Sequence, residues 1–344
     1  MSEGGKVSID SQLEVSVGLT QAVMEALRGL GVADVDGLLS QAGIDPRLLE
    51  KPENRIPFER QQALWGLAIE RAGTADFGLH FARCIQPTNF GLLGYMAMNY
   101  RTIGECFDAI VHYQFLAGQG GEFAQQCEDG LRALCYTPIN ADHPVSPQRV
   151  VGLLAATVSF GRWLVGEAFQ PRRVEFVHAA PPETVAYEEY FACPVKFGQA
   201  ANRLLFDDSV MTLVIPNASE ELLLLLSERA NRLLESQSQR SGLAGRVASL
   251  LATQLGDRLP DKSLIAAQLG MSERTMQRRL KGEGTSYQAI LDKTRHYLAR
   301  ELLRSTRVPL ADVALQLGFS EPSTFFRAFR KWEGITPGQF RESA

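Results

Sequence analysis

A short pattern occurs twice in the last third of the chain, and it limits the folds open to residues 263–341. Residues 266–273 read AAQLGMSE, and residues 314–321 read ALQLGFSE. Each copy closes a segment whose apolar residues recur at helical spacing, turns at a glycine, and leads into a segment rich in arginine. The repeat therefore predicts two units, each made of a helix, a tight turn and a second helix.

The turn residues suit this prediction. Gly270 and Gly318 stand where the first helix of each unit must end, and glycine tolerates the left-handed backbone needed there. Ser272 in the first unit, and Ser320 or Glu321 in the second, can cap the following helix through their side-chain oxygens. Each unit therefore has a stop signal followed by a start signal, as two joined helices require.

The second helix of each unit is expected to have a polar face and an apolar face. In the first unit the polar face holds Arg274, Gln277, Arg278 and Lys281, opposite Met276 and Leu280. In the second unit it holds Ser323, Phe326, Arg327, Arg330 and Lys331, opposite Phe325, Phe329 and Trp332. An arginine-rich face on one helix can simply be solvated. Two such faces after two matching turns favour helices that enter the major groove of DNA.

Residues 286–305 lie between the two units and have apolar residues at helical spacing. A helix of about 20 residues, at about 1.5 Å per residue, is about 30 Å long. Successive major-groove faces on one side of B-DNA lie about 34 Å apart. This segment is therefore predicted to be a rod that holds the two second helices about one DNA turn apart.

The charges are distributed unevenly along the chain. Residues 240–344 hold 17 Lys and Arg against 10 Asp and Glu, whereas residues 1–239 hold 18 against 29. The net charge of −4 therefore combines a basic C-terminal third with an acidic remainder. This asymmetry is typical of a localised site for nucleic acid, and the acidic part should keep DNA away from the rest of the chain.

Residues 240–344 resemble the DNA-binding domain of the AraC/XylS family of bacterial transcription regulators. In the first unit the resemblance is carried by Ser272, Arg274, Met276, Arg278, Leu280, Gly284, Tyr287, Arg295 and Ala299. In the second unit it is carried by Ala314, Gly318, Phe319, Ser323, Phe325, Arg327, Phe329, Arg330, Gly334, Thr336, Pro337 and Arg341. The resemblance implies an all-α domain with two helix-turn-helix units that binds double-stranded operator DNA. Regulators of this family usually activate transcription by contacting RNA polymerase.

The resemblance also implies which residues contact DNA. Base contacts would fall on Arg274, Gln277, Arg278, Ser323, Phe326 and Arg327; Lys281, Arg330 and Lys331 are expected to add DNA contacts from the same faces. Pro322 departs from the family, which often has a polar residue there, and it cannot read a base edge by hydrogen bonding. Phe326 can contact a thymine methyl group instead. Our hypothesis is that the first helix reads more of the sequence, while the second adds phosphate and apolar contacts.

The first 215 residues are expected to form a separate α+β domain. Helical spacing predicts helices at residues 15–30, 34–42, 58–72, 105–117 and 147–169. Residues 122–128 and 131–137 flank Asp129-Gly130, which is typical of a β-hairpin. Further strands are expected at residues 173–178, 193–197 and 203–207.

Residues 15–210 resemble the arabinose-binding-type N-terminal domain that a subgroup of AraC regulators shares. The resemblance is carried by FGLLGY at residues 90–95, TIGE at residues 102–105, and Tyr190, Phe191, Pro194, Val195 and Phe197. It implies a domain that senses an effector. The sequence does not read as an all-β sugar-binding barrel, so arabinose is not expected as the ligand.

An apolar effector pocket is one interpretation of the aromatic and apolar residues in this domain. The predicted pocket residues are Phe90, Leu92, Tyr95, Met96, Met98, Tyr113 and Phe115. Their alternative role is simply to form the core. The domain could also be an enzyme or a ligand-free interaction module, but no nucleophile elbow, phosphate loop or dinucleotide fingerprint is present. The five histidines are scattered, so no metal or cofactor is expected beyond a small-molecule effector.

The expected boundaries are 1–215 for the sensor, 216–242 for a bridge helix and linker, and 243–344 for the DNA-binding domain. The bridge helix is predicted at residues 219–236 and the polar linker at residues 237–242. A stripe on this helix, formed by Leu223, Leu226, Ala230 and Leu233, suits either a homodimer contact or packing on its own sensor domain. Ligand control would then act by a shift between two arrangements of the DNA-binding domains.

The sequence shows no export signal and no apolar run long enough to span a bilayer. Its five cysteines are an odd number without metal-ligand spacing. A reduced bacterial cytoplasm is the expected location, with no membrane partner.

Overall fold

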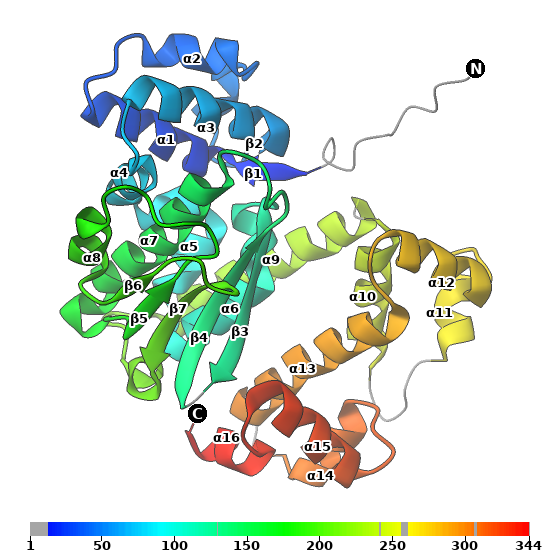
Figure 1. The fold of residues 1–344 in the computed structure, drawn as a ribbon. Helices are drawn as coiled ribbons and strands as arrows, with labels where there is room; N and C mark the ends of the chain where they lie inside the picture. Colours follow the sequence, from blue (N-terminus) through cyan, green and yellow to red (C-terminus); the bar gives the residue numbers. More distant parts are fainter. Residues whose placement is uncertain (1–12, 129, 241, 256–260, 306–307, 344) are drawn as a thin grey trace, which may run out of the picture. The chain divides into compact units, whose positions relative to one another are not determined.

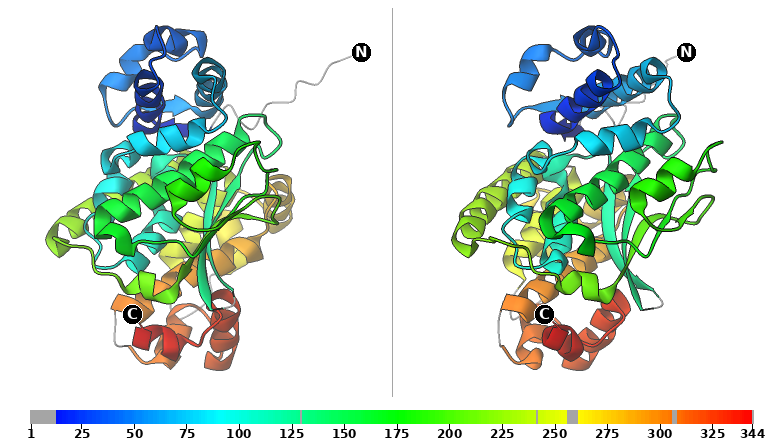
Figure 2. Two further views of the ribbon diagram at one scale, coloured as in Figure 1. Left: turned by 60° about the vertical axis from the view of Figure 1, so that its left-hand side comes forward. Right: turned by 90° about the vertical axis from the view of Figure 1, so that its left-hand side faces the viewer.

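The structure is a computed structural model that describes residues 13–128, 130–240, 242–255, 261–305 and 308–343. The chain divides into two compact units, Met1–Ala230 and Asn231–Ala344. Figures 1 and 2 show the course of the chain through each unit. The first unit is α+β and the second is all-α, which confirms the predicted fold class.

The first unit combines helices with two sheets. Its elements are β1 (Glu14–Ser16), α1 (Val17–Gly29), α2 (Val35–Gln41), η2 (Pro46–Glu50), β2 (Arg55–Pro57), α3 (Phe58–Ala72), α4 (Phe77–Cys84), η3 (Pro87–Phe90), α5 (Leu92–Ala97), α6 (Ile103–Ala117), β3 (Gly121–Glu128), β4 (Leu131–Pro138), α7 (Ser146–Val165), η4 (Gly166–Ala168), β5 (Arg173–Glu175), α8 (Val185–Phe191), β6 (Val195–Lys196), β7 (Asn202–Asp207) and η5 (Asp208–Thr212). The division between the two units falls within the next helix, α9 (Glu220–Arg240).

The main sheet of the first unit has the strand order β3-β4-β7-β5-β6. All neighbours are antiparallel except β5 and β6, which are parallel. The predicted hairpin is confirmed: Glu122 pairs with Thr137 in the β3-β4 register, and Gly130 in the turn has a φ of 76°. Asp129, the other turn residue, lies outside the described residues.

Alternating residues give the two faces of this sheet different roles. Leu134, Tyr136, Leu204 and Phe206 belong to the core of the unit. Phe206 on β7 packs edge-on against Phe107 of α6, with ring centroids 5.5 Å apart. Helices therefore cover this face, and the apolar cavity described below lies within this unit.

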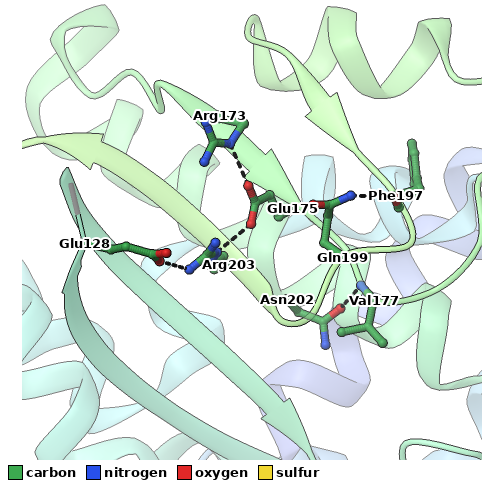
Figure 3. Close-up of polar contacts among 8 residues, drawn as sticks. All are labelled: Glu128, Arg173, Glu175, Val177, Phe197, Gln199, Asn202 and Arg203. Carbon is green, nitrogen blue, oxygen red and sulfur yellow. Dashed lines mark hydrogen bonds and ion pairs between the residues drawn. The ribbon is translucent and has the colours of Figure 1, made fainter.

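The opposite face of the sheet carries an ion-pair network (Figure 3). The carboxylate of Glu175 accepts hydrogen bonds from Nε of Arg173 at 2.6 Å and from Nε of Arg203 at 2.5 Å. Arg203 also pairs with Glu128. Burial of Glu175 raises its pKa, but the bonds from Arg203 and Arg173 outweigh burial and hold that pKa below its ordinary value. The network ties β3, β5 and β7 together on this face.

Several predicted boundaries change in the structure. Residues 14–16 pair with β2, so the first helix begins at Val17 and Ser16 caps it. Helix α6 begins at Ile103 because Thr102 and Glu105 form a capping box: each side chain bonds the other residue's backbone N–H at 3.3 Å. Helix α7 ends at Val165, since Gly166 has a φ of 72°. Helices α4, α5 and α8 are not among the predicted elements.

Residues Ser146–Ala168 are long and apolar enough to cross a membrane by length and composition. They belong to the core instead: α7 packs against α4, β4 and β7, and its buried side chains include Leu154, Val158 and Phe160. An apolar helix of this kind is typical of the centre of a globular unit.

The predicted bridge helix is longer in the structure. Helix α9 continues to Arg240, so most of the stretch 237–242 expected as a linker is helical, and Ser241 lies outside the described residues. The exposed apolar side chains of this helix are Leu222, Leu224 and Leu225, which do not belong to the predicted stripe. Leu223, Leu226 and Leu233 of that stripe are half-buried. Ala230 of that stripe is buried.

The second unit consists of helices around two small cores. Its elements after α9 are α10 (Leu243–Gln254), α11 (Lys262–Gln268), α12 (Glu273–Gly282), α13 (Tyr287–Ser305), α14 (Leu310–Gln316), α15 (Pro322–Glu333) and α16 (Pro337–Ser343). Helix α13 contributes to both cores: Tyr287 and Ile290 lie in the first, and Ala299 and Leu303 lie in the second. The helix predicted between the two helix-turn-helix units is therefore confirmed, and the spacing of one DNA turn stays a prediction.

Candidate nucleic-acid interface and effector cavity

The first helix-turn-helix consists of α11, the turn at Gly270 and α12. Gly270 has a φ of 70°, as predicted for the end of the first helix. Ser272 caps α12, and its hydroxyl oxygen accepts a hydrogen bond from the N–H of Thr275 at 3.3 Å. Glu283, just beyond α12, accepts bonds from the N–H groups of Leu243 and Ala244 at 2.8 Å and so caps α10. These bonds fix α12 against the rest of the first core.

Helix α12 separates its residues into two faces as predicted. Met276 and Leu280 are fully buried in the first core. The four predicted DNA-binding residues of this helix are all exposed: Arg274, Gln277, Arg278 and Lys281. Their spacing places them on one face that no described residue of the second unit covers.

The second helix-turn-helix consists of α14, the turn at Gly318 and α15. Gly318 has a φ of 68°, which repeats the geometry of Gly270. Glu321 occupies the cap position and Pro322 the first helical turn, but the Glu321 side chain makes no capping bond. Instead that carboxylate accepts a hydrogen bond from the Ser323 hydroxyl at 3.2 Å. The predicted cap at Ser320 is therefore wrong, because the helix begins one residue later, and the predicted cap through the Glu321 side-chain oxygen is wrong as well.

Helix α15 also has two distinct faces. Phe325 and Phe329 are fully buried, and Trp332 packs against the same second core. The predicted DNA-binding residues are exposed: Ser323, Phe326, Arg327, Arg330 and Lys331. Phe326 is 37% exposed, an apolar ring among cationic neighbours on the outer face.

Two sets of contacts, which were not predicted from the sequence, stabilise the second helix-turn-helix. Arg295 of α13 donates to the carbonyl oxygens of Leu317 at 2.9 Å and Gly318 at 2.6 Å. Glu333, at the end of α15, is buried and pairs with both Arg300 and His296 of α13. These contacts join α13 to both helices of the second helix-turn-helix. Arg295 belongs to the family pattern noted above, but nothing in the spacing indicated its carbonyl partners.

The first unit contains an apolar cavity with a volume of about 80 Å³, counted as space open to water centres. This is several times the roughly 10–15 Å³ that one water molecule needs on that measure. The wall is formed by Val15, Leu19, Gln61, Trp65, Phe81, Phe90, Leu93, Ala97, Ile103, Cys106, Phe107, Ile110, Gln114, Ala117, Gly118, Gly120, Gly121, Phe123, Tyr136, Arg149, Leu153, Thr157, Phe160, Gly161, Leu164 and Phe169. A cavity of this character suits a small, largely apolar ligand.

The structure places most of the predicted pocket residues away from this cavity. Phe90 lines it; Leu92, Tyr95, Met96, Met98, Tyr113 and Phe115 do not. Helical periodicity explains the difference on α6, because Ile110, Gln114 and Ala117 form the inward face. Tyr113 and Phe115 flank Gln114 and are rotated about 100° to either side of it. Tyr95 is 45% exposed.

Most of the wall, including Trp65, Phe81 and Arg149, was not predicted from the sequence. A signal was present for Arg149, which is the one charged residue in the apolar run 149–161. Gly118, Gly120 and Gly121 of the glycine-rich stretch 118–121 also line the cavity, and a Cβ atom at any of them would approach a neighbouring side chain closely.

The titratable groups of the first unit do not assemble a metal centre. Within the described ranges, no group of three or more His, Cys, Asp or Glu side chains could hold a metal ion. Burial lowers the pKa of His112 to about 4 and also lowers that of His178, so both imidazoles are neutral at pH 7. Burial raises the pKa of the Cys106 thiol to about 12, which keeps it protonated.

Comparison with known proteins identifies both units. Residues 33–214 match the family model described as the arabinose-binding domain of AraC transcription regulators, and residues 265–343 match a helix-turn-helix domain. The ornithine utilization regulator of Pseudomonas aeruginosa is 30% identical over 332 residues, which are 96% of each chain. The chain belongs to the AraC family of transcription regulators. It is a DNA-binding transcriptional regulator with an N-terminal domain of the ligand-binding type.

A second relative of this AraC regulator agrees with that assignment, and one solved structure aligns with most of the chain. The HTH-type transcriptional regulator VirS of Mycobacterium tuberculosis is 29% identical over 271 residues, 77% of this chain and 78% of VirS. The crystal structure of the transcriptional regulator CdpR from Pseudomonas aeruginosa aligns with a TM-score of 0.44 at 25% identity, covering 89% of this chain and 96% of CdpR. These relatives are described as regulators, so the comparisons do not favour an enzyme fused to a DNA-binding domain.

Proposed function

We propose that this AraC regulator reads two consecutive major grooves of one operator with α12 and α15. The observation that carries the proposal is that each of these helices buries its apolar face in a separate core while its cationic face is exposed. Helix α13 belongs to both cores. At about 1.5 Å per residue its length approaches the groove repeat of about 34 Å.

The two helices are proposed to read DNA differently. Arg274, Gln277 and Arg278 on α12 suit hydrogen bonds to base edges, and an arginine bonded to guanine is the commonest such contact. On α15, Pro322 and Phe326 offer no hydrogen bond to a base, and Phe326 suits a thymine methyl group. Ser323 and Arg327 complete the proposed base contacts, and Lys281, Arg330 and Lys331 would hold the phosphates. The first half-site would therefore tolerate fewer substitutions than the second.

The first unit is proposed to bind a small molecule in its apolar cavity and, when it does so, to change the arrangement of the DNA-binding domains.

A homodimer contact is proposed at helix α9. This helix leaves Leu222 and Leu225 exposed at a spacing of i, i+3, which suits such a contact. The proposed outcome is activation through RNA polymerase in a bacterial cytoplasm, as the family resemblance implies. A monodisperse monomer at micromolar concentration, bound to DNA as a single copy, would contradict the dimer.

Selection of binding sites from random DNA tests the proposed readout. The full-length protein should enrich a motif of two parts whose centres lie about 10 base pairs apart. The part read by α12 should carry the stronger base preference. Arg278→Ala should erase preference in that part alone. A motif with one part, or enrichment without any motif, would contradict the proposal.

A further inference from the structure

Arg149 is a buried cation on the wall of the effector cavity. It lies on α7 and is 5% exposed. Its guanidinium carbon lies 4.5 Å from the centroid of the Phe58 ring. Among the residues that the structure describes, no carboxylate pairs with Arg149 and no acceptor bonds its guanidinium. Apart from the Phe58 ring, this buried charge is uncompensated within the described ranges, which is costly, and the carboxylate of a ligand would supply the missing partner.

Two further polar side chains face the same space without a hydrogen-bonding partner in the described part of the chain. Gln61 and Tyr136 both line the cavity, and they are 3% and 4% exposed. Two other polar wall residues are satisfied: the Thr157 hydroxyl donates to the Leu153 carbonyl at 2.9 Å, and the Gln114 amide bonds the backbone of Phe123 at both ends. Gln61, Tyr136 and Arg149 therefore keep unused hydrogen-bonding capacity toward the cavity.

Adjacent glycines leave room for two of these groups. A Cβ atom at Gly120 would lie 2.4 Å from Nη2 of Arg149, and one at Gly121 would lie 2.4 Å from the Tyr136 hydroxyl. The two polar groups therefore border consecutive residues and form one polar end of the cavity. This also accounts for the glycine-rich stretch: larger residues would displace the groups that face the cavity.

Apart from Thr157 and Gln114, the rest of the wall is mainly apolar, and it contains no acidic residue. Trp65, Phe81, Phe107, Phe160 and Phe169 supply aromatic rings. An ammonium group would meet the Arg149 cation and find no Asp or Glu on the wall. The cavity therefore disfavours amines and diamines, and it favours a molecule with one anionic end and an apolar body.

We propose that the effector of this regulator is an organic carboxylate with an apolar chain or ring, bound through its carboxylate to Arg149. The guanidinium can donate two parallel hydrogen bonds to a carboxylate, and the Tyr136 hydroxyl and the Gln61 amide can donate others. The apolar body would lie against the aromatic rings. This inference rests on the proposed sensing function of the first unit and specifies its ligand.

Calorimetric titration of the full-length protein tests the inference with defined compounds. Butanoate, hexanoate, octanoate and phenylacetate form the test set, and the amine and the alcohol of matching length serve as controls. At least one carboxylate should bind with a Kd below about 1 mM, and its amine and alcohol should bind at least about tenfold more weakly. The inference is overturned if the amine binds as well as the carboxylate, or if no carboxylate binds.

Variants separate a ligand-binding role of Arg149 from a structural one. Arg149→Met should weaken carboxylate binding at least about tenfold, yet leave the melting temperature of the ligand-free protein equal or higher, because it removes an unpaired buried charge. Arg149→Lys keeps the charge without the planar fork and should bind with intermediate affinity. Arg172→Met, at an exposed position, is the matched control. A ligand-free Arg149→Met protein that melts well below wild type while Arg149→Lys binds normally would show a structural role.

The same proteins distinguish failure of this inference from failure of the proposed function. If a carboxylate binds wild type but not Arg149→Met, and DNA binding does not respond to it, the inference stands and the proposed ligand control fails. If DNA binding responds to another class of compound while all carboxylates fail to bind, the inference is wrong and the sensing function stands.

Discussion

The guanidinium of Arg295 lies over the ring of Phe319, with its central carbon 4.1 Å from the ring centroid. The same group donates to the carbonyl oxygens of Leu317 and Gly318, where α14 ends. A cation thus satisfies carbonyl groups that a helix terminus leaves without partners. Helix α13 thereby holds the turn of the second helix-turn-helix.

Replacing Arg295 should destabilise the second helix-turn-helix more than the first. Arg295→Met keeps much of the apolar stem but removes both hydrogen bonds, and bonds to charged groups contribute about 1.5–3 kcal/mol each. We expect a loss of about 2 kcal/mol in the free energy of unfolding, measured by urea denaturation. Arg279→Met, exposed on α12, is the control and should change stability by less than about 0.5 kcal/mol. Equal stability of both variants would show that the Arg295 contacts do not hold the turn.

Loss of Arg278 and loss of Arg327 should have different effects on DNA recognition. Arg278→Ala should cost about 1–3 kcal/mol on the preferred operator and less on operators mutated at the contacted base, so discrimination falls. Arg327→Ala should lower affinity more evenly across the panel. Equilibrium binding to a set of point-mutated operators measures both. The same loss of discrimination from the two variants would contradict the unequal division of readout between α12 and α15.

Gly318 adopts a backbone conformation that side chains disfavour. Its φ of 68° lies in the left-handed region, and a Cβ there costs roughly 1–2 kcal/mol. Gly318→Ala should therefore lower the free energy of unfolding by that amount, and Gly282→Ala should not, because Gly282 lies within α12 and a Cβ there would have no neighbour within 4 Å. Urea denaturation of the two variants gives the comparison. If Gly318→Ala leaves the free energy of unfolding unchanged, the backbone of the turn adjusts to accept the Cβ atom.

His112 should make the stability of the protein depend on pH. Burial lowers its pKa to about 4 in the folded state, from about 6.5 in the unfolded chain. The unfolded state therefore takes up the proton first, so the contribution is complete above pH 6.5 and is lost as the pH falls towards 4. Between pH 7 and pH 5 we expect this group to cost about 1–2 kcal/mol. His112→Gln should flatten the pH profile by that amount; parallel profiles would show that burial does not shift this pKa.

The helical repeat at the C-terminal end could be predicted from sequence because its determinants are local. Gly270 and Gly318 end helices by backbone conformation, and the faces of α12 and α15 follow from a period of 3.6 residues. The partners of Arg295 and Glu333 could not be found in this way. Their contacts join residues more than 20 positions apart, and only the packing of α13 brings them together.

The cavity was even harder to predict from the sequence than the contacts of Arg295 and Glu333. Its wall is drawn from β1, α1, α3, α4, η3, α5, α6, α7 and the β3-β4 hairpin, so no single periodicity describes it. Aromatic residues such as Tyr95 and Tyr113 were predicted to line a pocket. The helices that carry them point these side chains away from the cavity. Arg149 is the one charged residue in the run 149–161, but its role depends on the absence, among the described residues, of a nearby carboxylate, which only the folded chain shows.

Hydroxyl-radical footprinting of the full-length protein on a selected operator tests the two-groove reading most directly. The account predicts two protected windows on one face of the duplex, about 10 base pairs apart. Arg278→Ala should lose the window under α12, and Arg327→Ala should weaken the window under α15. A single window, or even protection along the whole fragment, would contradict the claim that two helices of one chain enter consecutive major grooves.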